Sequence, residues 1–144
     1  MIYIGADHGG FKLKEAVKSW LTETEIDYQD MGAFEFVEDD DFVDFAKGVV
    51  DNIKNPEDRG ILICRSGMGV DIVANRFSHI RCGLGINADQ VAAGRRDDNI
   101  NVLALAADFY DEDESRNLLT AFLKTEFSNE ERYIKRLNKI KEIR

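Results

Sequence analysis

The sequence predicts an α/β fold, a three-layer α/β/α Rossmann-like sandwich with a five-stranded parallel sheet and an extra C-terminal helix. Short apolar runs alternate with segments of helical periodicity, which is the pattern of βα units around a parallel sheet. The chain has 144 residues and a single proline, so a linker or a disordered tract has little room. We therefore expect one domain over residues 1–144.

Five apolar runs have the length and composition of buried strands. They are Met1–Ala6, Ile26–Met31, Gly60–Cys64, Cys82–Ile86 and Val102–Ala106. Because helical segments connect them, we expect these strands to pair in parallel.

Helical periodicity fills the intervals between the strands. One-sided apolar faces mark helices around Leu13–Leu21, Phe42–Ile53 and Ile72–Arg76, and two more are expected near Asp89–Arg96 and Glu112–Lys124. Each strand thereby gains the crossover helix that a parallel sheet requires.

A final helix over about residues 130–143 follows after the sheet is complete. Tyr133, Leu137 and Ile140 form an apolar stripe along it. Since no strand remains to be covered, we expect this helix to pack on a second copy of the chain and to serve as a dimerisation helix.

Four consecutive acidic residues, Glu38 to Asp41, precede the second predicted helix. Acidic side chains cap the free amides at a helix N-terminus and complement its dipole. We interpret this run as a solvated loop that caps the helix.

The overall charge limits the partners of the chain. Lys and Arg number 19 against 28 Asp and Glu, a net charge of −9, which opposes binding to nucleic acid or to an anionic membrane. Two cysteines are too few for a secreted disulfide scaffold, and no apolar run reaches the length of a signal peptide or a membrane span. We expect a cytoplasmic protein that binds neither nucleic acid nor membrane.

The segment Ile61–Val70 carries the strongest chemical signal. A buried strand delivers Cys64 to a glycine-bearing turn that opens a helix, where free amides and the helix dipole favour an anion and a thiolate. The alternative is an ordinary strand-to-helix turn with an inert cysteine, because the turn matches neither the dinucleotide fingerprint nor the P-loop.

The first strand ends in Asp7 and His8, followed by Gly9 and Gly10. If the first and third strands are neighbours, these two side chains share a crevice with Cys64, where they can orient hydroxyls and move protons. The alternative is that Asp7 only caps the helix and His8 is a hydrogen-bonded turn residue. No metal is expected, because the histidines and cysteines lack the paired spacing of metal sites.

The last helix carries Arg132 and Arg136, four residues apart and so on one face, where they can bind a phosphate bidentately. The alternative is a basic face that only keeps the helix soluble, since lysines also line it. The polar run Asp97, Asp98 and Asn99 before the last strand has the composition of a solvated turn.

Several ordered segments of the chain resemble ribose-5-phosphate isomerase B and the galactose-6-phosphate isomerase subunits. The resemblance implies a sandwich that dimerises, active sites at the subunit interface, and an aldose-ketose isomerisation of a sugar phosphate without metal or cofactor. The segments that carry it are Ile4–Lys14, Asp41–Ala46, Gly60–Gly69, Ala74–Arg76, Ile80–Arg81, Asn101–Leu105, Thr125–Phe127, and Arg132 with Arg136.

The same resemblance assigns roles to residues. Cys64 resembles the base that removes a proton from the sugar, and the turn around Ser66 would stabilise the enediolate oxygen. Asp7 and His8 resemble the residues that hold hydroxyls and assist proton movement. The catalytic set is thus Cys64, Ser66, Asp7, His8 and Asp97; the substrate-binding set is Arg65, Gly67, Met68, Gly69, Asp98, Asn99, Arg132 and Arg136.

The chain departs from the family pattern at chemically important positions. Asp97 stands where the family usually has the histidine assigned to ring opening, Asp108 stands where some members have a phosphate-binding arginine, and Arg65 replaces a glycine. Arg65 can replace the missing positive charge. Two functions therefore stay open, an isomerase and a non-catalytic or differently catalytic sugar-phosphate-binding protein.

Overall fold

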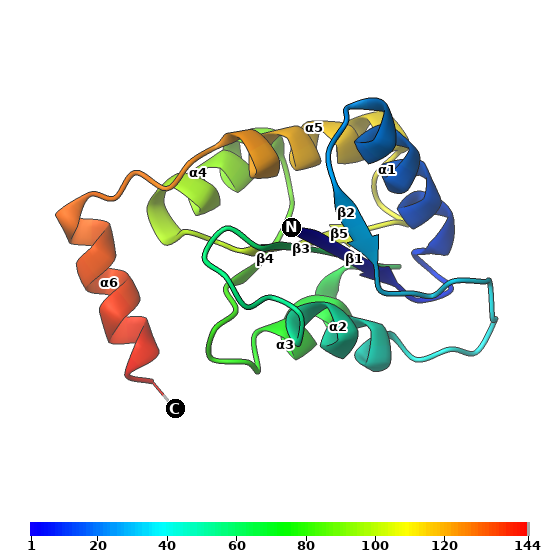
Figure 1. The fold of residues 1–144 in the computed structure, drawn as a ribbon, viewed down its shortest axis with the longest axis horizontal. Helices are drawn as coiled ribbons and strands as arrows, with labels where there is room; N and C mark the ends of the chain where they lie inside the picture. Colours follow the sequence, from blue (N-terminus) through cyan, green and yellow to red (C-terminus); the bar gives the residue numbers. More distant parts are fainter. Residues whose placement is uncertain (144) are drawn as a thin grey trace.

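A computed structural model, which describes residues 1–143, has a five-stranded all-parallel sheet between two layers of helices (Figure 1). The predicted fold class is confirmed, and so is the order of its elements. In chain order these are β1 (Ile2–Ala6), α1 (Phe11–Glu23), β2 (Tyr28–Asp30), α2 (Phe42–Val50), β3 (Arg59–Cys64), α3 (Met68–Ala74), β4 (Cys82–Leu84), α4 (Ala88–Asp98), β5 (Val102–Ala106), α5 (Glu112–Lys124) and α6 (Glu131–Lys141).

The strand order is β2-β1-β3-β5-β4. Ala6 pairs with Ile63, and Cys64 pairs with Ala106, so β1, β3 and β5 end side by side at the carboxyl edge of the sheet. The chain leaves β1 toward β2 on one side and later returns to β3 on the other. Such a switch point opens a crevice where α/β sheets bind ligands.

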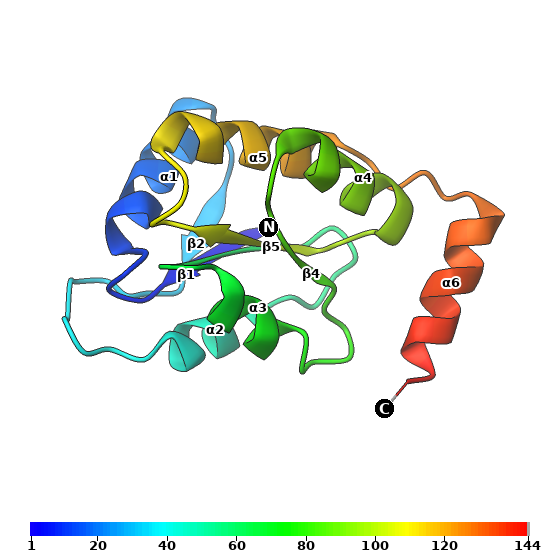
Figure 2. The same ribbon diagram turned by 180° about the vertical axis from the view of Figure 1, so that it is seen from behind.

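Successive residues of β3 enter two different cores. Ile61 and Ile63 pack with α1, α4 and α5 on one face of the sheet. Leu62 and Cys64 pack with α2 and α3 on the other face. This alternation produces the three layers seen from both sides in Figures 1 and 2, and it explains why β3 is apolar throughout.

The two edge strands are shorter than predicted. β2 covers Tyr28–Asp30 rather than Ile26–Met31, because the Ile26 amide closes the end of α1 by donating to the Leu21 carbonyl oxygen, 2.9 Å away. β4 ends at Leu84 rather than Ile86, whose amide donates to the side chain of Gln90. Apolar composition marked these residues as strand, but an edge strand has only one neighbour to extend it.

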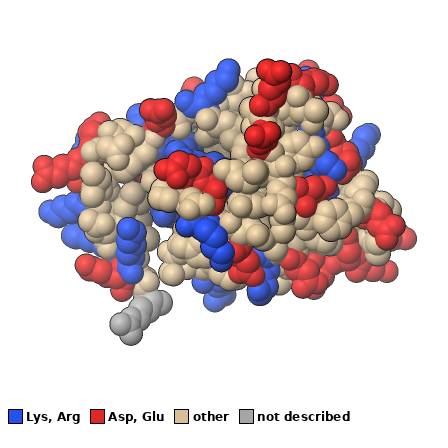
Figure 3. Space-filling view, viewed as in Figure 1, with Lys and Arg blue, Asp and Glu red and all other residues tan. Residues whose placement is uncertain are grey.

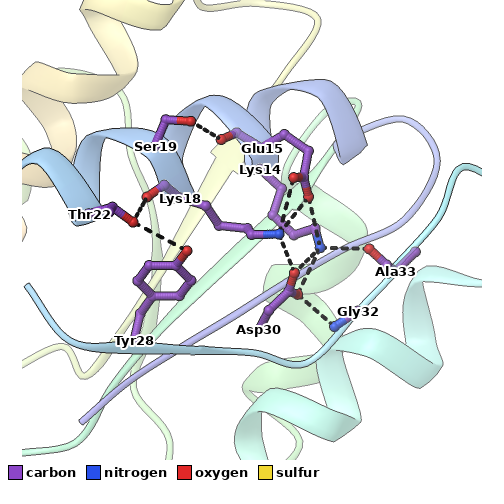
Figure 4. A network of polar contacts seen from close by, with 9 residues as sticks. All are labelled: Lys14, Glu15, Lys18, Ser19, Thr22, Tyr28, Asp30, Gly32 and Ala33. Carbon is purple, nitrogen blue, oxygen red and sulfur yellow. Dashed lines mark hydrogen bonds and ion pairs between the residues drawn. The ribbon is translucent and has the colours of Figure 1, made fainter.

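A buried lysine holds the start of the segment between β2 and α2 in place by hydrogen bonds (Figure 4). Lys14 of α1 is 0% exposed, and its Nζ donates to both oxygens of Asp30, at 2.7 and 2.8 Å, and to the carbonyl oxygen of Ala33. Burial alone would raise the pKa of Asp30, but the hydrogen bonds from Lys14 and Lys18 lower it. The chain after β2 therefore leaves the sheet from a fixed point.

The last helix stands apart from the sandwich, beyond the end of α4 (Figures 1 and 2). Tyr133 is its one buried residue among those described, while Ile134 and Ile140 are exposed. Across residues 1–143, every helix is too short or too polar to span a membrane.

Candidate active site

Cys64 ends β3 at the middle of the carboxyl edge, and its side chain is enclosed. The residue is 5% exposed, and the amide of Gly67 donates to its Sγ across 3.1 Å. Gly67 has a φ of +73°, and a Cβ on it would lie 2.5 Å from the Leu84 side chain. Glycine is therefore required in this turn, which aims a backbone N–H at the sulfur as a thiolate needs.

Asp7 follows β1 directly beside Cys64, as the adjacency of β1 and β3 predicts. Its carboxylate is buried and accepts from the amide of Gly10 at 3.1 Å. A Cβ on Gly10 would lie 2.4 Å from the carbonyl oxygen of Ile63, so this turn approaches β3 as closely as glycine allows. The alternative that Asp7 caps the helix is not found, because α1 has no side-chain cap; the hydrogen bond instead closes the turn before the helix and fixes the carboxylate next to the cysteine.

His8 bonds to Asp40, a residue that the sequence placed in a solvated loop. The Oδ1 atom of Asp40 lies 2.7 Å from the His8 backbone nitrogen and 2.8 Å from the ring Nδ1. The side chain of Asp40 is only 10% exposed, so that part of the loop prediction is wrong. Asp41 does cap α2 as predicted, by accepting from the Val43 amide.

The histidine is basic in this environment. The hydrogen bond from its ring to Asp40 raises the pKa of His8, and the nearby charge of Asp7 acts in the same direction. Burial and the charge of Arg65 oppose the change but do not cancel it. His8 is therefore protonated over a wider pH range than an isolated histidine.

Arg65 and Asp108, the two departures from the family pattern closest to Cys64, form an ion pair. Arg65 Nη1 lies 3.6 Å from Asp108 Oδ2, and the Asp108 amide donates to the Arg65 carbonyl oxygen at 3.0 Å. The side chains of Arg65 and Asp108 are 63% and 48% exposed, so this ion pair adds little stability. The pair matters for the charge of the site. Arg65 offsets the negative charge of Asp108, which stands where the family resemblance implies an arginine.

The predicted site residues 97–99 lie at the amino edge of the sheet, opposite the edge that carries Cys64. Asp97, Asp98 and Asn99 precede the first residue of β5, which pairs with Gly60 near the start of β3. Since a strand rises about 3.3 Å per residue, the four steps from Gly60 to Cys64 separate the two edges by roughly 13 Å. One chain therefore does not bring these residues to Cys64.

Asp97 and Asn99 already form hydrogen bonds with other residues of the same chain. Arg96 holds the Asp97 carboxylate at 2.9 Å and lowers the pKa of Asp97, with Tyr133 and Arg132 acting in the same direction. Asn99 ends α4 with a φ of +48°, and its carbonyl oxygen accepts from Arg81. Asp98 is exposed.

Arg132 and Arg136 share one face of α6, as their spacing predicts. Their guanidinium carbons lie 4.5 and 5.5 Å from the centre of the Tyr133 ring. Arg132 also pairs with Glu130 at 3.0 Å. The aromatic ring thus holds two cations side by side on an exposed helix.

One set of possible metal ligands occurs among residues 1–143, with donor atoms of Asp7, His8 and Asp40 within 4.8 Å of one another. The hydrogen bond between His8 and Asp40 brings two of these groups together, and the amide of Gly10 occupies one oxygen of Asp7. These contacts account for the cluster without an ion.

Comparison with known proteins gives consistent matches along the chain. The sequence model described as Ribose/Galactose Isomerase matches residues 2–140. A probable ribose-5-phosphate isomerase B of Mycoplasma genitalium is 35% identical over 141 residues, which cover 96% of this chain and 92% of the relative.

Solved structures extend the match to three dimensions. A ribose 5-phosphate isomerase of Thermotoga maritima superposes with a TM-score of 0.93 at 36% identity, covering 99% of this chain and 97% of the other. The Mycoplasma genitalium ribose-5-phosphate isomerase B, solved with bound ribulose-5-phosphate, has a TM-score of 0.92 at 34% identity, covering 98% and 93%.

Proposed function

The chain belongs to the ribose/galactose isomerase family and is a sugar-phosphate isomerase, and we propose that it interconverts ribose 5-phosphate and ribulose 5-phosphate with Cys64 as the base. The observation that supports this most directly is the geometry around the sulfur. An amide donates to Sγ at the end of a buried strand, and Asp7 and His8 follow the neighbouring strand.

In the proposed reaction the thiolate of Cys64 removes the proton from C2 of the open-chain aldose. The electron pair of that C–H bond forms the C1–C2 double bond, and the carbonyl electrons move to O1. The thiol then returns its proton to C1 while a proton leaves O2, which gives the ketose. Asp7 and His8 are suited to carry the proton between O2 and O1, because general acid-base groups must lie within hydrogen-bond reach of the oxygens.

The turn after Cys64 would stabilise the intermediate. Backbone amides around Ser66 and Gly69 would face the position where negative charge develops on oxygen, while the Gly67 amide donates to Cys64 Sγ. Met68 is exposed beside this turn and would line the substrate-binding surface. The proposed chemistry consists of proton transfers, so it requires no metal and no cofactor.

We further propose a homodimer in which a second copy completes each active site. Arg132, Arg136 and the residues Asp97, Asp98 and Asn99 lie at the edge opposite Cys64, so within one chain they cannot contact the same substrate. In the dimer, α6 of one copy lies at the carboxyl edge of the other. Substrate phosphate then meets the paired arginines despite the net charge of −9.

Surface features support this arrangement. Lys and Arg lie beside a few acidic residues where α6 lies, and Asp and Glu predominate toward the opposite lower end of the molecule (Figure 3). Met68 and Ile72 are exposed on α3, and Ile134 and Ile140 are exposed on α6. A groove of about 460 Å³ beneath α6 is lined partly by Ile53, Ile80, Phe127, Leu137 and Ile140. Burial of exposed apolar side chains is a common driving force for the formation of a symmetric dimer.

A binding protein without isomerase activity is the second candidate. The observation that favours it is Asp97, a carboxylate held by Arg96 where ring opening would require a proton-transfer group. The cytoplasm suits both candidates, because Cys64 and Cys82 are free thiols and a net charge of −9 opposes binding to nucleic acid or to an anionic membrane.

Proton NMR of ribose 5-phosphate in D₂O distinguishes the two functions. An isomerase produces ribulose 5-phosphate, which carries deuterium at C1 to the extent that the Cys64 thiol exchanges its proton with solvent before returning it, and a panel of other sugar phosphates then ranks the substrates. A thermal shift with ligand, without isomer exchange and without deuterium uptake, would replace the isomerase by the binding protein.

A further inference from the structure

We propose that Asp40 is the positioning residue of this site, which orients the His8 ring so that Nε2–H donates a hydrogen bond to a substrate oxygen. This inference rests on the proposed function, since it names the group that makes His8 a donor in that reaction. It assigns a role to a residue outside the motif segments that the sequence singled out.

The hydrogen bonds of Asp40 fix both the backbone and the ring of His8. A single oxygen, Oδ1, accepts from the His8 backbone amide and from the ring Nδ1. A carboxylate only accepts, so Nδ1 carries a proton and Nε2 is the ring atom left for another partner. Phe36 contacts the ring edge-on, with 6.5 Å between the centroids, and restricts its rotation.

The surroundings of His8 favour its protonated form. Asp40 raises the pKa of His8 by accepting the ring hydrogen bond, and Asp7 from β1 adds to the effect. Arg65 from the turn after β3 opposes it, as does burial. Because the net change is upward, the pKa of His8 lies above its ordinary value of 6.5, and Nε2 stays a donor over a wider pH range than in a free imidazole.

The chain holds Asp40 in place from both sides. Upstream, Lys14 binds the Ala33 carbonyl oxygen at 2.6 Å, and downstream Asp41 caps α2. The other oxygen of Asp40, Oδ2, is buried and has no hydrogen-bond partner among residues 1–143, so the protein directs this carboxylate at His8 alone. Its acidic neighbours Glu38 and Asp39 are exposed instead.

This arrangement matters because the other cation near Cys64 is less firmly held. The side chain of Arg65 is 63% exposed and lies 3.6 Å from Asp108, whereas the His8 ring is hydrogen-bonded to Asp40, so His8 can donate a charged hydrogen bond from a fixed direction. A charge-assisted donor is stronger than a neutral one, so it suits an oxygen that becomes negative during proton transfer.

The chain contains only two histidines, so an NMR titration of their ring protons tests the proposal directly. In the wild type we expect His8 to titrate above 6.5. In Asp40→Asn its titration should move down in pH, while Asp39→Asn, the matched exposed neighbour, should leave it unchanged. His79 serves as the internal reference, and Asp40→Glu, which keeps the charge, should retain the elevated titration.

Kinetics supply a readout that a merely structural role would not change. At a pH between the measured His8 titrations of the two proteins, where only the wild-type ring is protonated, we expect kcat/KM of Asp40→Asn to be reduced about tenfold, the effect of losing one charged hydrogen bond. At a pH below both titrations, where both rings are protonated, most of that loss should disappear. An unchanged His8 titration in Asp40→Asn, or an equal loss at both pH values, would overturn the proposal. If the wild type does not isomerise, the proposed function fails, and the titration still decides the role of Asp40.

Discussion

The two edges of the sheet differ in how completely one chain builds them. At the carboxyl edge, buried strand ends place Cys64, Asp7 and His8 together, and backbone amides or side chains hold each one. At the other end, α6 stands apart and offers Arg132 and Arg136 on an exposed face. The comparison indicates that one chain holds the proposed acid-base groups together, whereas the proposed anion-binding arginines would need a second copy of the chain to reach them.

The largest expected effect is the loss of the proposed base at the preorganised edge. Cys64→Ala should lower kcat by about 10²–10⁴-fold, the usual contribution of a general base, while circular dichroism shows an unchanged fold. Cys82→Ala is the matched control, because burial raises the pKa of that thiol and keeps it uncharged. Turnover near the wild-type rate in folded Cys64→Ala would reject the role of Cys64.

The stability of the same edge should depend on the buried lysine. Lys14→Met removes one member of a buried ion pair and leaves Asp30 without its main partner, which typically costs about 3–5 kcal/mol. Urea denaturation measures the change in the free energy of unfolding. Lys47→Met, at an exposed ion pair of α2 with Asp51, should change it by less than about 1 kcal/mol. Equal effects of the two substitutions would contradict the view that Lys14 fastens this edge.

Substitutions on α6, the proposed anion-binding helix, should change the affinity for substrate rather than the fold. Arg136→Ala should raise KM for a sugar phosphate by about one to two decades, since a charged hydrogen bond contributes roughly 1.5–3 kcal/mol. Lys139→Ala, also on α6, is the control. Phosphorylated and unphosphorylated forms of one sugar should differ strongly on the wild type and less on Arg136→Ala. Equal use of both forms by both proteins would remove phosphate from the proposal.

The smallest effect concerns acid stability. Because the hydrogen bonds from Lys14 and Lys18 outweigh burial and lower the pKa of Asp30, this carboxylate adds stability above its ordinary value of 3.8. That contribution is lost as the pH falls from 3.8 through the lowered pKa. Thermal unfolding of Asp30→Asn should therefore depend less on pH in this acidic range than the wild type does. An unchanged dependence would show that other carboxylates dominate it.

The sequence predicted the carboxyl edge well because strand adjacency brings its groups together. Once β1 and β3 are neighbours, Asp7 and Cys64 must end side by side, whatever the loops do. The segment between β2 and α2 follows no such rule. Its path depends on Lys14 reaching the Ala33 carbonyl oxygen, a tertiary contact, so four consecutive acidic residues gave no sign that only Asp40 turns inward.

The ion pair between two departures from the family pattern also could not be predicted from the sequence. Arg65 and Asp108 are distant in the chain and meet only because β3 and β5 pair. The same pairing shows that Asp97 and Cys64 lie at opposite edges, which the list of motifs alone did not reveal. Edge strands β2 and β4 were overestimated for a related reason, since local hydrogen bonds competed with the sheet.

A complementation experiment tests the shared site most directly. At substrate concentrations well below the wild-type KM, Cys64→Ala and Arg136→Ala should each be impaired alone, because every site in either homodimer carries the defect. Unfolding the two together in equal amounts and refolding them gives heterodimers, in which one site carries both substitutions and the other carries neither. The account predicts recovery toward about a quarter of wild-type activity, since half of the dimers would contain one intact site of two. If the mixture shows no more activity than the average of the two variants refolded separately, the residues of the two edges do not act in one shared site.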